Sequence, residues 1–185
     1  MKKRLPWLAA LALIPAAQAV EYRELQPAAS SLGFQYRQMG VTMDGKFRKF
    51  SAQLSFDPDK PAAARARIDV ELASIDTGSA EADQEVGSKP WFHTAAYPQA
   101  SFVASSIKPL GGNRYEASGK LSIKGRSQDI VAPLTYTPQG KQASFSGSFS
   151  FRRSDFAIGE GSWAAPDIVA NEIRIQFNLV ASGGK

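Results

Sequence analysis

The residue types that support enzymatic chemistry are scarce in this chain. It holds a single histidine, His93, and no cysteine, so it lacks both the ligands of a three-histidine metal site and a thiol nucleophile. Neither a G-x-S-x-G nucleophile motif nor a glycine-rich phosphate loop occurs. A triad of His93, Asp76 and one of many serines has no positional support. We therefore expect no catalytic residues, no metal and no cofactor.

Basic side chains offer a second kind of chemistry, the binding of an anionic head group. A phosphate or diphosphate would need one or two cations beside it, and Lys124 and Arg153 are the main candidates. Lys89, Arg126 and Arg152 are also available. The alternative for each is an ordinary solvated surface charge, and Arg153 could instead pair with Asp155 and fix its loop.

The first 19 residues have the layout of a secretory signal peptide. Three basic residues at 2–4 precede an apolar run at 5–14, and Ala17 and Ala19 are the small residues that signal peptidase requires. A membrane anchor fits poorly, because the run is shorter than the roughly 20 residues that span a bilayer. We expect cleavage after Ala19, one domain over residues 20–185, and a location in a bacterial periplasm.

The net charge gives little reason to expect nucleic acid as a partner. Three of the 22 basic residues lie in the signal segment, which leaves 19 against 17 acidic residues, a balance of +2. Without cysteine there are no disulfides, so stability depends on the apolar core and on hydrogen bonds.

Apolar side chains recur at every second position in eight segments, which is typical of strands with one buried face. The fold class we predict is an all-β, eight-stranded antiparallel barrel. Phe47 is out of step with Phe50, which indicates a bulge, and Pro133 indicates an edge or bulged strand that leaves dimerisation open. The eight segments are 32–37, 50–56, 66–72, 99–106, 115–123, 130–136, 144–151 and 169–179.

Two connections between these strands are long and rich in aromatic residues. Residues 79–86 predict a short helix between the third and fourth strands, capped by Ser79 and ended by Gly87. An aromatic cluster follows at 91–97, and a second irregular stretch at 154–166 holds more aromatic side chains. These connections are expected to form the two lips of an opening.

An eight-stranded barrel is either filled by its own side chains or holds one slender ligand. Small residues on the apolar faces, such as Ala117, Gly119 and Gly147, would leave room along the axis. They could equally accommodate the large rings opposite them in a solid core. An outer-membrane barrel would also show alternation, but several of these runs are short.

Several motifs, in this order and spacing, resemble the YceI family, the lipocalin-like polyisoprenoid-binding proteins of the bacterial periplasm. The resemblance covers nearly the whole chain after residue 19, and it implies a barrel with a long apolar pocket for an isoprenoid or another single-tail amphiphile. The motifs are Phe34-x-Tyr36, Met39-Gly40-Val41, Gly45-Lys46-Phe47-x-x-Phe50, Ser74-Ile75-Asp76-Thr77-Gly78, Trp91-Phe92-x-x-x-x-Tyr97-Pro98-x-x-x-Phe102, Gly119-Lys120-Leu121-Ser122-Ile123-Lys124-Gly125 and Arg153-Ser154-Asp155-Phe156-x-Ile158-Gly159.

We therefore expect a periplasmic carrier or storage protein for an isoprenoid-type lipid, either polyprenyl or quinone-like. The alternatives are a fatty-acyl binder and a solid-cored protein that binds another envelope protein. Transient contact with a membrane or a membrane protein would accompany transfer of the lipid. Plain core packing is the alternative role for part of the expected pocket wall, which consists of Phe34, Tyr36, Met39, Met43, Phe47, Phe50, Trp91, Phe92, Tyr97, Phe149, Phe151, Phe156 and Trp163.

Overall fold

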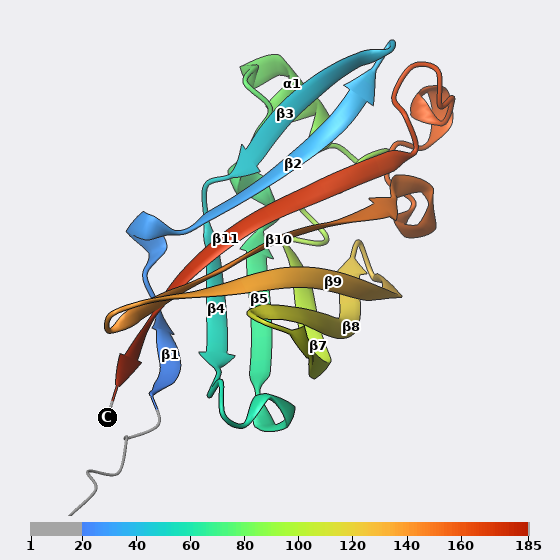
Figure 1. Cartoon of the computed structure of the whole chain (residues 1–185). Helices are drawn as coiled ribbons and strands as arrows, with labels where there is room; N and C mark the ends of the chain where they lie inside the picture. The colour runs from blue at the N-terminus through green and yellow to red at the C-terminus, as the bar shows by residue number, and fades with distance from the viewer. Residues whose placement is uncertain (1–19, 185) are drawn as a thin grey trace, which may run out of the picture.

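The structure is a computed structural model that describes residues 20–184, so the predicted signal peptide lies outside the described residues. One antiparallel sheet of eleven strands and one α-helix, α1 (Ala80–Val86), make up the fold (Figure 1). The strands are β1 (Glu21–Leu25), β2 (Ser31–Gln38), β3 (Val41–Phe47), β4 (Phe50–Ser55), β5 (Arg65–Glu71), β6 (Ile75–Asp76), β7 (Gln99–Gly111), β8 (Arg114–Ile123), β9 (Arg126–Gln139), β10 (Gln142–Arg152) and β11 (Glu172–Gly184).

The predicted fold class is confirmed. The eight predicted segments correspond in order to β2, β4, β5, β7, β8, β9, β10 and β11, and β1, β3 and β6 are additional strands. The prediction of a bulge around Phe47 was wrong, because Phe47 ends β3 and Phe50 begins β4. The two rings are out of step because the chain leaves one strand and enters another between them.

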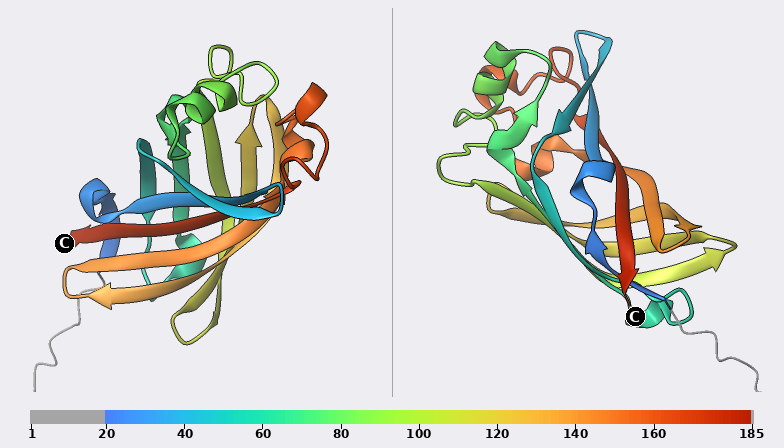
Figure 2. Two further views of the ribbon diagram at one scale, coloured as in Figure 1. Left: turned by 90° about the horizontal axis from the view of Figure 1, so that it is seen from above. Right: turned by 90° about the vertical axis from the view of Figure 1, so that its left-hand side faces the viewer.

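The sheet curls into a barrel with its two ends joined along the chain. Its strand order is β4-β5-β7-β8-β9-β10-β11-β2-β3-β6, and β3 runs directly into β4. β1 pairs with β11 and bridges to the segment after β4, where Tyr22 and Phe56 exchange backbone hydrogen bonds of 2.9 and 3.0 Å. β1 therefore closes one end of the barrel, and both described termini lie at that end (Figures 1 and 2).

Pro133 lies where β9 separates from β10. β9 pairs with β8 along Arg126–Thr135, but its pairing with β10 begins only at Leu134, opposite Gly147. Because proline has no N–H group to donate, it suits the point where a ladder ends. The first half of β9 is consequently unpaired on its β10 side.

The predicted short helix is α1, and it lies at the end of the barrel opposite the termini (Figure 2). Ser79 caps it, since its Oγ accepts a hydrogen bond from the N–H of Ala82 at 3.4 Å. No helix within residues 20–184 is long and apolar enough to cross a bilayer.

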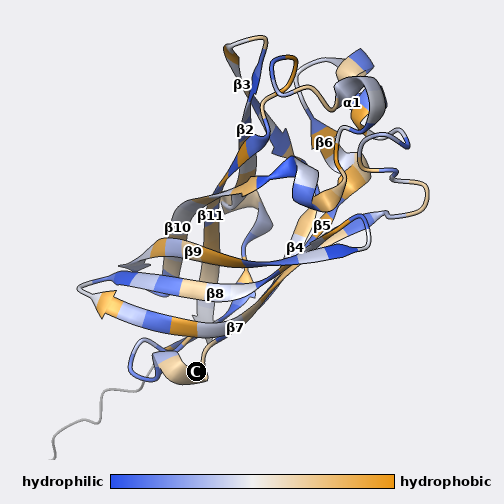
Figure 3. Cartoon of the chain, turned by 90° about the vertical axis from the view of Figure 1, so that its right-hand side faces the viewer, coloured by the Kyte–Doolittle hydropathy of each residue, from blue (hydrophilic) through white to orange (hydrophobic). Residues whose placement is uncertain are grey.

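The closed end is filled by aromatic side chains. Phe56 is fully buried there and packs against Tyr115, Tyr136 and Phe145 at ring-centroid distances of 5.0–5.2 Å. Toward the open end, polar and apolar residues alternate along strands such as β7 (Figure 3), which places an apolar face inside the barrel.

Candidate functional site

A cavity of about 770 Å³ runs inside the barrel. It reaches from an open mouth, where Tyr36, Glu81 and Trp163 line it, to Phe56 and Phe145 at the closed end. This volume is within the range of about 300–1,000 Å³ typical of small-molecule sites. Nearly every strand contributes apolar side chains to the wall.

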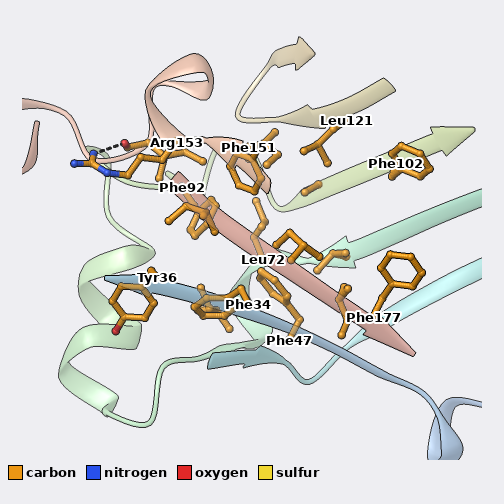
Figure 4. Close-up of a pocket in the computed structure, with 18 of the residues that line it drawn as sticks. Phe34, Tyr36, Phe47, Leu72, Phe92, Phe102, Leu121, Phe151, Arg153 and Phe177 are labelled. Carbon is orange, nitrogen blue, oxygen red and sulfur yellow. Dashed lines mark hydrogen bonds between the residues drawn. The ribbon is translucent and has the colours of Figure 1, made fainter. Parts of the chain in front are cut away.

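Eight of the residues expected in the pocket wall line this cavity (Figure 4). They come from β2, β3 and β10 and from the two irregular connections at the mouth. The sheet therefore brings together segments that are distant in the sequence. These residues are Phe34, Tyr36, Phe47, Trp91, Phe92, Phe149, Phe151 and Trp163.

The other five do not line it. Met39 is 70% exposed at the β2–β3 turn, and Tyr97 is exposed on the 87–98 loop. Phe156 is fully buried behind the wall, where its ring meets that of Phe151 edge to face at 5.3 Å. Met43 and Phe50 are partly buried outside the cavity.

Large rings line the cavity without filling it because three of them lie over glycines. A Cβ built on Gly45 would come within 2.8 Å of three atoms of the Phe34 ring. A Cβ on Gly119 would lie 2.7 Å from the Phe102 ring, and one on Gly147 would lie 2.7 Å from the Phe177 ring, although in both cases a backbone oxygen is closer still. The small residues therefore accommodate large rings, as expected for a solid core. Because a glycine has no side chain, the ring above it lies close to the backbone, and the space along the barrel axis stays open.

Arg153, the first head-group candidate, is only 2% exposed although it lines the cavity. All five of its N–H groups donate to backbone carbonyls, at 2.7–3.2 Å. Its guanidinium also lies 5.7 Å from the centre of the Trp91 ring, and burial lowers its pKa. It does not pair with Asp155, which accepts from Arg152 instead. The acceptors are the carbonyls of Ile158, Gly159, Trp163, Val169 and Ala170.

Lys124, the second candidate, is likewise occupied and does not line the cavity. Its Nζ donates to the carbonyl oxygen of Ala157 at 2.6 Å and to a carboxylate oxygen of Glu160 at 3.0 Å. The hydrogen bond from Lys124 lowers the pKa of Glu160. Lys124 therefore holds the 153–160 segment against the turn between β8 and β9.

One side-chain hydrogen bond joins the two lips of the mouth. The indole Nε1 of Trp163 donates to Oε1 of Glu85 on α1 at 2.9 Å. Both residues line the cavity, and the Trp163 ring also packs on Trp91 at 5.5 Å. Beside them, burial and then the charge of Asp83 raise the pKa of Tyr36, so its phenol stays neutral.

Two buried polar atoms lack a hydrogen-bond partner among the described residues, Ser88 Oγ and Trp91 Nε1. Both residues line the cavity and belong to one turn, in which the N–H of Trp91 donates to the carbonyl of Ser88 at 3.1 Å. An unpaired buried donor costs about 1–3 kcal/mol, so an acceptor that reached either atom would be favoured.

Much of the cavity wall was not predicted from the sequence. Phe102, Phe145 and Phe177 lie in phase with the apolar faces of their strands, and that alternation could have identified them. The family motifs, on which the predicted wall was based, contain mainly aromatic residues near turns. His93 does not line the cavity, and no group of three or more His, Cys, Asp or Glu side chains in the described chain is arranged to hold a metal.

An antiparallel barrel that is closed at one end and encloses a long apolar cavity defines a ligand-binding protein rather than a filled structural barrel. Residues 24–181 match the model of the YceI-like domain, and the chain belongs to this family. The chain is 32% identical over 135 residues to a UPF0312 protein of Pseudomonas savastanoi pv. phaseolicola, which covers 70% of this chain and 67% of that protein.

The solved structures that resemble this one include one from Burkholderia cenocepacia and one from Saccharophagus degradans. Burkholderia cenocepacia BcnA is 41% identical with a TM-score of 0.84, covering 86% of this chain and 100% of that chain. A polyisoprenoid-binding domain from Saccharophagus degradans is 15% identical with a TM-score of 0.69, covering 90% and 99%. The second likeness, at this identity, concerns the fold alone.

Proposed function

We propose that this protein reversibly binds one long apolar lipid of the isoprenoid type, polyprenyl or quinone-like, and shields it from water during storage or transfer. The observation that carries the proposal is the cavity of about 770 Å³, which is lined mainly by aromatic and aliphatic side chains. Burial of an apolar tail contributes roughly 25 cal/mol per Å² before ordering costs, so such a wall selects for hydrophobic area. Family membership and the fold shared with a polyisoprenoid-binding domain support it.

The charges around the cavity favour a neutral head group over a phosphate or a carboxylate. The donors of Arg153 are occupied, and Lys124 is bound to Glu160 outside the cavity. The other charged residues that line it, Glu81 and Glu85, are acidic and would repel an anion. A neutral acceptor is also what Ser88 Oγ and Trp91 Nε1 would accommodate, once a ligand displaced the side chains that cover them.

The same argument places the fatty-acyl alternative second, because a fatty-acid carboxylate would lie near these acidic residues. A solid-cored protein does not fit a cavity of this volume. We further propose that binding occurs without turnover, since the one histidine, His93, is outside the cavity. The signal-peptide pattern of residues 1–19 supports a periplasmic location, where a water-insoluble lipid needs a carrier.

Native mass spectrometry of the protein purified from the periplasm of its own host tests the proposal, together with organic extraction of what co-purifies. We expect one lipid per chain, with an isoprenoid tail and an uncharged head. Repeated absence of any bound lipid, or a phosphorylated lipid as the main species, would contradict it.

A further inference from the structure

The tip of the β2–β3 hairpin presents apolar side chains to water. Met39 and Val41 are 70% and 59% exposed, more than any other large apolar residue in the described chain. Single exposed apolar residues are common on protein surfaces, but here two lie at one narrow projection.

The backbone conformation of this tip is unfavourable for the methionine that occupies it. Met39 has a φ of +47° and Gly40 a φ of +82°, so both central residues of the turn are left-handed. Two-residue hairpin turns of this kind favour Asn or Gly at the first position, because other side chains clash with the backbone there. A methionine is an unfavourable choice for the turn itself, which points to a use for its side chain.

The tip continues directly from the cavity wall. Tyr36 and Gln38, on the strand leading to it, line the cavity. The N–H of Met39 donates to the carbonyl of Ile168 at 2.9 Å, and Gln38 forms a β-bridge with Val169. The tip is thus bound to the loop that carries Trp163, and it lies at the same end as α1, away from the termini (Figure 1).

We infer that Met39 and Val41 insert into a lipid bilayer and orient the mouth of the cavity toward it, so that a lipid passes over the hairpin tip into the barrel. This inference rests on the proposed function. Two side chains bury on the order of 200 Å². A stable protein interface needs about 800 Å² on each partner, so a tip of this size suits shallow, reversible insertion rather than a protein partner.

The test compares uptake of a dansyl-labelled farnesyl ether from vesicles of phosphatidylethanolamine and phosphatidylglycerol. The variant is Met39→Asn with Val41→Thr, which keeps the strand residue β-branched and gives the turn a preferred residue. We expect the uptake rate to fall about tenfold, while the affinity for the probe delivered without vesicles and the melting temperature do not decrease.

The matched control is Leu110→Asn with Val131→Thr. Leu110 is 48% exposed beside the β7–β8 turn, near the closed end, and Val131 is 53% exposed on β9. These changes remove similar apolar surface away from the mouth, so uptake should stay at the wild-type rate. Equal slowing in both variants, or slowing in neither, would overturn the inference.

Flotation of the protein with the same vesicles provides a readout that does not depend on cargo. If the wild-type protein bound no probe but floated in a Met39- and Val41-dependent manner, the proposed function would fail and the docking inference would stand. The docking inference would be overturned if flotation did not depend on the tip, or if the tip variant bound the probe more weakly. It would also be overturned if sedimentation gave a lower mass for the tip variant than for the wild-type protein. The last result would mean that the tip binds a second copy of the chain.

Discussion

At the scale of single residues, the cavity depends on glycines that let aromatic rings lie against the wall. Gly45 is informative because the three atoms that a Cβ there would meet first all belong to the Phe34 ring. A side chain at this position would therefore displace the ring, which lines the cavity, rather than disrupt the strand.

Gly45→Ala is expected to move the Phe34 ring and weaken binding of geranylgeraniol about five- to tenfold while the fold is retained. Gly33→Ala is the matched control, because a Cβ there would meet two backbone oxygens, of Gly45 at 3.3 Å and of Gln176 at 4.0 Å, and no ring. Titration followed by tryptophan fluorescence gives both affinities. Equal affinities in the two variants would show that the ring position does not matter.

Arg153 was expected to contact a ligand head group, but its role in the structure is to hold the backbone around it. Its five hydrogen bonds hold the 158–170 segment, including the lip that carries Trp163. A lysine has three donors and no planar fork, so it leaves buried carbonyls without partners.

Arg153→Lys is expected to lower the free energy of unfolding by about 2–4 kcal/mol. Arg152→Lys, the control on the adjacent exposed residue, should change it by less than about 0.5 kcal/mol. Urea denaturation measures both. A loss below about 1 kcal/mol for Arg153→Lys would mean that its hydrogen bonds contribute little to stability.

At the scale of elements, the alternation of apolar residues predicted eight of the eleven strands in the described chain, because each of these has one face on the cavity and one in water. The strands β1 and β6 were missed because they are defined by pairing with segments distant in the sequence. β3 pairs with its neighbour β2 and was missed because Gly45 interrupts the apolar side chains on its inner face. The residues of the cavity wall were predicted only in part. Alternation shows which face is buried, but whether Met43 or Phe177 reaches the cavity depends on how the sheet curls.

The two lips of the mouth, α1 and the 154–168 loop, are joined by one side-chain hydrogen bond, which would restrain any widening of the mouth as a ligand enters. Trp163→Phe removes the Nε1 donor that joins them through Glu85 and keeps an aromatic ring. We expect probe association and dissociation both to accelerate about three- to tenfold with little change in Kd. Stopped-flow fluorescence measures the two rates.

Glu85→Gln is the control for the lip contact, because its amide oxygen can still accept the hydrogen bond from Trp163. Its rates should stay close to those of the wild type. A Trp163→Phe variant that changed Kd without changing the association rate would mean that the Trp163 ring acts by contacting the ligand and not by joining the lips.

At the scale of the whole molecule, the two ends of the barrel differ: the mouth is at one end and a cluster of aromatic side chains forms the base at the other. The hydroxyl of Tyr136 donates to that of Tyr22 at 3.2 Å within this base. Burial, followed by this hydrogen bond, raises the pKa of Tyr136 well above its ordinary value of about 10.

The base should therefore weaken at alkaline pH. Because the folded-state pKa of Tyr136 is raised, its contribution is fully present below the unfolded value of about 10 and is lost as pH rises toward the folded value. We expect wild-type stability to fall as pH rises above about 10, and that of Tyr136→Phe to fall less steeply. Tyr97→Phe, at an exposed position, should keep the wild-type slope; equal slopes in all three proteins would contradict this account.

The central claim is that the lipid tail occupies the barrel interior, and filling that interior tests it most directly. Ala117 lies on β8 at 4% exposure and lines the cavity, so Ala117→Phe places a ring in the space that the tail would use. Native mass spectrometry with geranylgeraniol should show a one-to-one complex for the wild-type protein and none for a folded Ala117→Phe variant. Equal binding by both proteins, or no complex with the wild type, would contradict the account.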